Sequence, residues 1–303
     1  MYARAATTVA LLGAGALVLP LSTAAAQPGS APTSAPASSA AARHDRPLVV
    51  AHRGASAQAP ENTFAAIDRA RELGFTWVEN DVQRTRDGEL VIMHDDTLKR
   101  TTNVEALYPD RAPWKVADFT AKEIARLDAG SWFSPKYAGQ RVPTLKQYLR
   151  RVSHNHQKLV FEFKRPELYP GIEKQGLRVL RDTGWLDRHH VTGKLVVQSF
   201  SADSVKKVHA LRPDVKTGFL GTPAVADLPK YARFADQINS THTSISGSYV
   251  SAIHARKGPH GKPLEIFTWT VNDGPAAVRA ARFGVNGIIT NTPDVVRKAL
   301  RDS

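Results

Sequence analysis

The 303-residue sequence contains no cysteine. This absence excludes disulfide bonds, thiolate zinc sites, iron–sulfur clusters, cysteine nucleophiles and a lipidated N-terminal cysteine. Acidic residues are also scarce, because 28 Asp and Glu stand against 41 Lys and Arg and give a formal net charge of +13. That excess of positive charge favours anionic partners such as phosphorylated substrates, anionic lipid, acidic wall polymers or nucleic acid, and charge alone does not choose among them.

Long hydrophobic runs are absent beyond the N-terminus, where no segment approaches the ~20 apolar residues of a transmembrane helix. The apolar run at residues 5–21 follows Arg4 and precedes an Ala-Ala-Ala site at residues 24–26. This order is typical of a cleaved secretory signal peptide, and the lack of a twin-arginine pair favours the general secretion route. We therefore expect a signal peptide at residues 1–26 and a secreted protein with no stable membrane anchor.

The next segment, residues 27–42, has no charged residue and consists mostly of Ala, Ser and Pro. Such a composition is typical of a disordered linker, so the folded domain is expected at residues 43–303. A hydrophobic content of 42% is sufficient for a buried core. The length could suit two average domains, but a single α/β barrel of roughly 250 residues fits equally well.

Short β-rich runs alternate with helix-length segments along the folded domain. Eight runs are predicted to be strands, at residues 48–52, 77–82, 90–94, 158–164, 195–200, 215–220, 266–271 and 287–290. Strands that alternate with helices indicate a parallel sheet, and eight strands in a domain of about 260 residues favour an α/β fold of the closed (β/α)8, or TIM barrel, type. A ninth candidate at residues 237–240 is one strand too many and stays unassigned.

A long segment, about residues 97–143, separates the third predicted strand from the next predicted helix. It is rich in Pro, Trp and Tyr and is too long for an ordinary connection. We predict an insertion after the third strand that lies over the barrel mouth.

Charged residues recur on the inward positions of two predicted strands, because side chains two residues apart share one face. In the run KLVFEFK the two phenylalanines suit the helix layer, so Glu162 and Lys164 should point into the barrel. In the run WVENDV, Glu79 and Asp81 likewise share a face.

Two histidines, His52 and His94, each close an apolar run and should lie at the C-terminal ends of strands, where the active sites of such barrels are found. The three acidic residues could not all stay ionised there without a cation, because burial and mutual repulsion raise carboxyl pKa values. Ca²⁺ or Mg²⁺ would resolve this repulsion, since both ions prefer oxygen ligands. The candidate ligands are Glu79, Asp81 and Glu162.

Metal, imidazoles and fixed cations together indicate phosphodiester cleavage. The histidines can act as base and acid, and Arg53 and Lys164 offer positive charge to a phosphate. Burying such a set without partners would be costly, which argues against a purely structural role. Two other classes stay open: a secreted binder of anionic lipid or wall polymer, and a glycoside hydrolase that uses Glu79 and Glu162 as its carboxylate pair.

The same residues belong to a longer series of motifs that covers residues 48–300. The early motifs are His-Arg-Gly at 52–54, Pro-Glu-Asn-Thr at 60–63, Glu-x-Asp at 79–81 and His-Asp at 94–95. The later ones are Glu-x-Lys at 162–164, Gln-Ser-Phe at 198–200, Thr-Trp-Thr-Val-Asn at 268–272 and GVNGIITNTP at 284–293. In this series the sequence resembles the glycerophosphodiester phosphodiesterase family.

The resemblance implies a barrel with a small insertion and a metal-dependent enzyme that cleaves small-molecule glycerophosphodiesters into glycerol 3-phosphate and an alcohol. Position by position, it implies metal ligands at Glu79, Asp81 and Glu162, an acid–base pair at His52 and His94, phosphate contacts at Arg53 and Lys164, and pocket-lining residues at Gln198 and Trp269. Teichoic acid and lysophospholipids are further candidate substrates, the nearest enzymatic alternative is a lysophospholipase D or sphingomyelinase D, and no nucleic acid is expected as a partner.

Three motif residues need separate comment. Asn62 precedes a helix-length segment and is interpreted as a helix N-cap. Members of the family often carry Asp where this chain has Asn286 and Asn291. Both positions lie on or next to the last predicted strand, which we expect to be outside the metal site, so this difference should alter local contacts more than catalysis.

Overall fold

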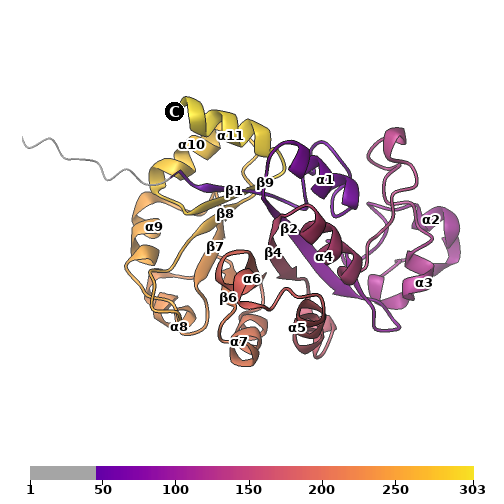
Figure 1. Cartoon of the computed structure of the whole chain (residues 1–303), viewed down its shortest axis with the longest axis horizontal. Helices are drawn as coiled ribbons and strands as arrows, with labels where there is room; N and C mark the ends of the chain where they lie inside the picture. The colour runs from indigo at the N-terminus through magenta and orange to yellow at the C-terminus, as the bar shows by residue number, and fades with distance from the viewer. Residues whose placement is uncertain (1–45) are drawn as a thin grey trace, which may run out of the picture. The chain divides into compact units, whose positions relative to one another are not determined.

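The centre of the molecule is a ring of eight parallel strands surrounded by helices (Figure 1). The computed structural model describes residues 46–303, and the predicted signal peptide and linker lie outside them. The ring consists of β1 (Leu48–Ala51), β2 (Trp77–Arg84), β4 (Lys158–Phe163), β5 (Leu195–Ser199), β6 (Lys216–Leu220), β7 (Gln237–Thr241), β8 (Phe267–Trp269) and β9 (Gly287–Thr290). Because β1 pairs with both β2 and β9, the ring is closed, and the predicted (β/α)8 fold is confirmed.

Helices follow most of the strands and pack their apolar faces against the ring. They are α1 (Phe64–Glu72), α4 (Leu145–His154), α5 (Ile172–Asp182), α6 (Arg188–Gly193), α7 (Ala202–Leu211), α8 (Leu228–Tyr231), α9 (Gly247–His254), α10 (Gly274–Phe283) and α11 (Pro293–Asp302). Within residues 46–303, every helix is too short or too polar to span a bilayer.

Helix α4 illustrates how the sequence defines these elements. Its buried residues recur at helical spacing, at Leu145, Tyr148, Leu149 and Val152. At its start, the Thr144 side chain accepts a hydrogen bond from the backbone of Gln147, whose side chain bonds back to the backbone of Thr144. This capping box satisfies two backbone donors that a helix end would otherwise leave free.

One predicted barrel strand lies outside the ring. The segment β3 (Leu90–Ile92) pairs antiparallel with the far end of β2. The assignment of residues 90–94 as the third barrel strand is therefore wrong, and the unassigned run at 237–240 forms barrel strand β7. The Asp87-Gly88 turn explains the difference, because a short turn reverses the chain whereas parallel neighbours need a crossover of a dozen or more residues.

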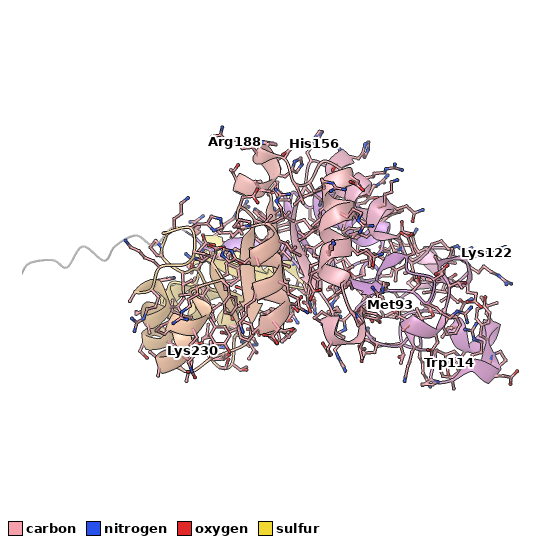
Figure 2. All side chains as sticks on the ribbon, turned by 90° about the horizontal axis from the view of Figure 1, so that it is seen from below. Met93, Trp114, Lys122, His156, Arg188 and Lys230 are labelled. Atoms are coloured by element: carbon pink, nitrogen blue, oxygen red, sulfur yellow. The ribbon has the colours of Figure 1, made fainter. Side chains whose placement is uncertain are left out.

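The segment between β3 and α4 has its own apolar core. It contains the short helices α2 (Val104–Leu107) and α3 (Ala121–Ile124) and the 3₁₀ turns η1 (Pro109–Arg111), η2 (Val116–Asp118) and η3 (Pro135–Tyr137). Its buried residues include Leu98, Phe119 and Leu127. We expected this insertion over the barrel mouth, but it lies beside the barrel (Figure 1), with Met93 on its barrel side and Trp114 at its far edge (Figure 2).

Apolar side chains fill the part of the barrel interior that supports the mouth. Val50, Val160, Val196, Phe267 and Ile289 form one buried cluster. The next inward positions toward the C-terminal ends of β1, β4 and β5 lie two residues later, at His52, Glu162 and Gln198. On these three strands the inward-facing side chains therefore change from apolar to polar between one inward position and the next. The polar positions form the floor of the site.

Candidate active site

Glu79 and Asp81, in the first part of β2, and Glu162, near the C-terminal end of β4, form a buried carboxylate cluster. The register of the two strands places Asp81 directly beside Glu162. One carboxylate oxygen from each of the three residues lies within 4.8 Å of the others, and each residue is at most 5% exposed. The structure thus brings together the three predicted metal ligands.

Two cationic side chains contact this cluster, but their positive charge does not neutralise the negative charge of the carboxylates. Lys164 Nζ lies 2.9 Å from Glu162 Oε1 and 3.7 Å from Asp81 Oδ1. Arg53 Nε lies 3.3 Å from Asp81 Oδ2, but its Nη1 donates to a fourth carboxylate, Glu61, at 2.9 Å. Asp81 Oδ1 itself accepts no hydrogen bond. Because Glu61 is also bound by Arg100, the three carboxylates of the cluster have only Lys164 and a shared Arg53 as cationic partners.

The pKa values of the cluster reflect this shortage of positive charge. Burial raises the pKa of Glu79 well above its usual value, and the charges of Asp81 and Glu162 add to the effect. Burial and Asp81 also raise the pKa of Glu162 to about 7. Burial alone would raise the pKa of Asp81 too, but Arg53 and Lys164 outweigh it and lower that pKa to about 2. A divalent cation with a preference for oxygen ligands fits this set of donors.

Asn62 contacts the cluster directly and does not cap a helix. Its Nδ2 donates to Asp81 Oδ2 at 2.8 Å, and its φ of 59° lies in the left-handed region that asparagine tolerates better than most residues. Helix α1 is capped by Thr63, whose side chain accepts from Ala66 N. The interpretation of Asn62 as the N-cap is therefore wrong by one residue.

His52 follows β1 and points one ring nitrogen at a neutral amide. Its Nδ1 lies 2.6 Å from Asn291 Oδ1, which also accepts from Ser56 Oγ at 3.0 Å. Its Nε2 lies 3.9 Å from Glu79 Oε2. Burial, together with the charge of Arg53, lowers the pKa of His52 to about 4.

The contact between His52 and Asn291 corrects a second expectation. Residue 291 follows β9, and β9 pairs with β1 where the ring closes. The first and last strands are therefore neighbours, and Asn291 lies beside the site rather than away from it. Asn286, at the other end of β9, contacts His254 Nε2 and the backbone N–H of Ile266.

His94 reaches the site from the β2–β3 hairpin rather than from the end of a barrel strand. The backbone N–H of Met93 donates to Asp81 O at 3.0 Å, which places the next residue beside the carboxylates. His94 Nδ1 lies 2.7 Å from Asp95 Oδ1. The buried Gln83 Nε2 donates to the carbonyl oxygens of Met93 and Asp95 and fixes this turn.

A pocket of about 110 Å³ collects the predicted site residues. All nine line it: His52, Arg53, Glu79, Asp81, His94, Glu162, Lys164, Gln198 and Trp269. Gln198 Oε1 accepts from Asn239 Nδ2 at 2.9 Å, and Trp269 Nε1 donates to Asn239 O at 2.9 Å. The half-exposed ring of Phe200 packs edge-to-face on Trp269 with 5.5 Å between centroids, and completes an aromatic wall.

The sequence of the chain is similar to that of a known enzyme family. The model of the glycerophosphoryl diester phosphodiesterase family matches residues 52–295. The chain belongs to this family. A glycerophosphodiester phosphodiesterase of Bacillus subtilis is 35% identical over 268 residues, which cover 84% of this chain and 86% of that protein. One from Caldanaerobacter subterraneus subsp. tengcongensis is 34% identical over 84% of this chain and 98% of its own length.

Solved structures of family members share the fold. An Oleispira antarctica phosphodiesterase, in complex with the product sn-glycerol-3-phosphate, is 28% identical with a TM-score of 0.71, and the match covers 85% of this chain and 97% of that one. A glycerophosphodiester phosphodiesterase of Agrobacterium tumefaciens is also 28% identical, with a TM-score of 0.64 over 83% and 99% of the two chains. As a phosphodiesterase of this family the protein is an enzyme, so the binder and the glycoside hydrolase are set aside.

Proposed function

We propose that this phosphodiesterase hydrolyses glycerophosphodiesters to glycerol 3-phosphate and an alcohol, with Ca²⁺ or Mg²⁺ held by Glu79, Asp81 and Glu162. The observation that carries the proposal is the excess of buried carboxylates over cations in a pocket that also contains two histidines. The glycerol 3-phosphate bound to the Oleispira antarctica relative supports the choice of substrate.

The cations of the pocket bind the phosphoryl group in this proposal. A bound divalent ion would neutralise negative charge that develops on the phosphate oxygens. Lys164 lines the pocket with an ammonium group, and Arg53 lines it with a guanidinium held by Glu61 and Asp81. Gln198 and Trp269 line the remaining wall, where they would orient the glycerol or the alcohol.

We assign His52 as the general base, because its hydrogen bonds leave one nitrogen free to accept a proton. Asn291 Oδ1 is an acceptor only, so the short contact requires a proton on His52 Nδ1. In the neutral imidazole the lone pair then lies on Nε2, the nitrogen nearer Glu79. This tautomer can take a proton from the attacking oxygen.

We assign His94 as the general acid, because its partner is a carboxylate. Asp95 accepts the Nδ1 proton of His94 and stabilises the positive charge of an imidazolium. His94 Nε2 can then hold a second proton and transfer it to the departing alkoxide. The two histidines therefore differ in the partner of Nδ1, which is a neutral amide for His52 and a carboxylate for His94.

Metal dependence is tested with glycerophosphocholine as substrate. We expect chelator to abolish release of glycerol 3-phosphate, and added Ca²⁺ or Mg²⁺ to restore it. A panel of glycerophosphodiesters, lysophosphatidylcholine and teichoic acid under the same conditions identifies the alcohol that is cleaved. Full activity in chelator would overturn the metal site, and exclusive cleavage of the lysophospholipid would identify a lysophospholipase D instead.

The histidine roles are tested with a leaving group that needs no acid. His52→Ala and His94→Ala should each lose about 10²–10⁴-fold in kcat/KM on glycerophosphocholine. A p-nitrophenyl phosphodiester, whose leaving group is far more acidic than an alcohol, should largely restore His94→Ala but not His52→Ala. Equal rescue of both variants, or of neither, would contradict the assignment.

We also propose that the enzyme is secreted after cleavage of residues 1–26. The apolar run and the Ala-Ala-Ala site support this, and the intact mass of the exported protein tests it. A mass that begins at Gln27 is expected, and retention of residues 1–26 would contradict the proposal.

A further inference from the structure

Arg100, at the start of the insertion, connects two carboxylates that flank the active site. Its Nη1 and Nη2 donate to the two oxygens of Glu61, each at 2.8 Å. Its Nε and Nη2 donate to the two oxygens of Asp95, at 2.7 and 3.0 Å. One guanidinium thus makes a bidentate contact with each carboxylate, which fixes their orientation more tightly than single bonds would.

Each of these carboxylates holds a residue of the pocket. Asp95 accepts from His94 Nδ1, and Glu61 accepts from Arg53 Nη1. A continuous series of hydrogen bonds therefore runs from His94 through Asp95, Arg100 and Glu61 to Arg53. Arg100 is its central member and is supplied by a different part of the chain from Glu61.

Arg100 itself does not line the pocket, and its side chain is 44% exposed. It therefore acts through its partners. The hydrogen bond from His94, and those from Arg100, hold the pKa of Asp95 well below its usual range against the opposing effect of burial. Without Arg100 the Asp95 carboxylate could rotate, and the imidazole that it orients would lose its fixed direction.

We propose that Arg100 is a positioning residue that aligns His94 through Asp95, and Arg53 through Glu61, so that the insertion controls the geometry of the acid. The inference rests on the proposed role of His94. A misplacement of about 1 Å in a catalytic group can cost on the order of 10²-fold in rate, so a residue outside the pocket can have a large effect.

The first test compares Arg100→Met with Arg151→Met in the full-length enzyme with metal present. Arg151 is a matched control, because its side chain is 43% exposed and it makes a bidentate contact with Asp68 on the outside of the barrel. We expect Arg100→Met to lower kcat on glycerophosphocholine about 10–100-fold, with a smaller change in KM, and Arg151→Met to leave kcat within about 2-fold. The two variants should have similar Tm values.

The conservative variant tests the geometry of the contact. Arg100→Lys keeps the charge but cannot form two bidentate contacts, so it should restore only part of the lost kcat. Full activity in Arg100→Lys would overturn the role of the guanidinium fork.

The second test asks whether the effect passes through the acid. With a p-nitrophenyl phosphodiester, the defect of Arg100→Met should shrink as it does for His94→Ala and not persist as for His52→Ala. Adding Asp95→Asn to Arg100→Met should cost less than Asp95→Asn alone costs, because the two residues act as a unit. A defect that is the same for both substrates would overturn the inference.

The outcomes separate this inference from the proposed function. Loss of activity in His94→Ala with no loss in Arg100→Met, relative to Arg151→Met, overturns only the role of Arg100. Full activity in His94→Ala overturns the proposed acid and the inference together.

Discussion

The barrel interior has a charged side and a neutral side. Strands β1, β2 and β4 contribute histidine, carboxylates and lysine to the pocket. From Glu162 the register continues through three uncharged residues, which are Gln198 on β5, Gly218 on β6 and Gln237 on β7. At the mouth the charge is therefore concentrated on adjacent strands, and the pocket residues from the other strands, such as Gln198, Leu220 and Trp269, are uncharged.

The two sides also differ in how well their polar atoms are satisfied. On the neutral side, Asn239 Nδ2 donates to Gln198 Oε1 at 2.9 Å and to Gln237 Oε1 at 3.3 Å, while Asn239 Oδ1 accepts from Phe267 N. On the charged side, Asp81 Oδ1 accepts no hydrogen bond. Buried polar groups are normally paired, so the satisfied amide of Asn239 indicates a structural role and the unsatisfied carboxylate of Asp81 indicates a ligand.

Gly218 makes the neutral side possible. A Cβ at this position would lie 2.8 Å from Asn239 Nδ2 and 3.4 Å from Gln198 Cβ. The absent side chain leaves room for the amides to meet in the middle of the barrel.

The largest effect is expected when one negative charge is removed from the carboxylate cluster on the charged side. Glu162→Gln should weaken Ca²⁺ and Mg²⁺ binding by more than ~10²-fold, beyond the effect usual for groups that only support a ligand, and should abolish activity while leaving the fold intact. Isothermal titration measures the affinity. Unchanged affinity would place Glu162 outside the metal site.

The reverse change introduces a charge on the neutral side. Asn239→Asp replaces two donated hydrogen bonds by a buried carboxylate that faces two amide oxygens, so the free energy of unfolding should fall by about 3 kcal/mol. Urea unfolding provides the measurement. Asn103→Asp is the control, because this exposed asparagine uses its Oδ1 as an acceptor for Asp128 N and aspartate keeps that acceptor. Equal unfolding free energies in the two variants would show that the neutral side tolerates a buried charge.

A pH dependence follows from the raised pKa of Glu162 in the metal-free enzyme. Between pH ~4.5 and 7 the unfolded chain loses this proton while the folded protein keeps it, so stability falls as pH rises, and above pH 7 the penalty is constant. Glutamine does not titrate. In chelator, the stability of Glu162→Gln should therefore rise relative to that of the wild type over this window, by about 3 kcal/mol at pH 8.

The difference between the two proteins reports Glu162 together with its effect on the pKa of Glu79, because the remaining titrating residues are common to both. Thermal unfolding from pH 4 to 8 is the measurement. Saturating Ca²⁺ should reverse the order, since only the wild type keeps all three ligands. A gap that does not change with pH would show that Glu162 titrates normally.

The smallest effect is expected for a carboxylate at the opposite end of the strands. Glu265 accepts from Lys216 Nζ at 2.6 Å and from Gln237 Nε2 at 2.8 Å, and its side chain is 31% exposed. Glu265→Gln should change stability by less than ~1 kcal/mol and leave metal affinity unchanged, because a solvated ion pair contributes little. A metal affinity that falls as it does for Glu162→Gln would show that removing any barrel carboxylate has this effect.

The charged side could be predicted from the sequence because its signal is local. Glu79 and Asp81, and likewise Glu162 and Lys164, lie two residues apart in apolar strands, so alternation alone aligns them. The neutral side could not be predicted in this way. Strand β7 reads QINST, with amides at its inward positions and Ile238 as its one apolar residue, so the run at 237–240 is a strand candidate that the sequence alone does not place in the barrel.

Contacts that depend on closure of the ring also escaped prediction. Asn291 and His52 are 239 residues apart and meet because β9 pairs with β1. Arg100 and Glu61 are separated by 39 residues and meet because the hairpin returns the chain to the mouth. The His-Asp motif gave a signal for Asp95, whereas nothing in the pattern around Arg100 distinguished it from other surface arginines.

The β2–β3 hairpin also sets a boundary for protein engineering. Because β3 returns the chain to the mouth before the insertion begins, His94, Asp95 and Arg100 belong functionally to the barrel although they precede or open the inserted segment. A chimera that exchanges residues 103–141 for the corresponding segment of a relative would keep these three residues on their own scaffold. A junction placed at residue 97 would instead replace Arg100 with a donor residue, so the junction that keeps the catalytic residues together lies about six residues further along the chain.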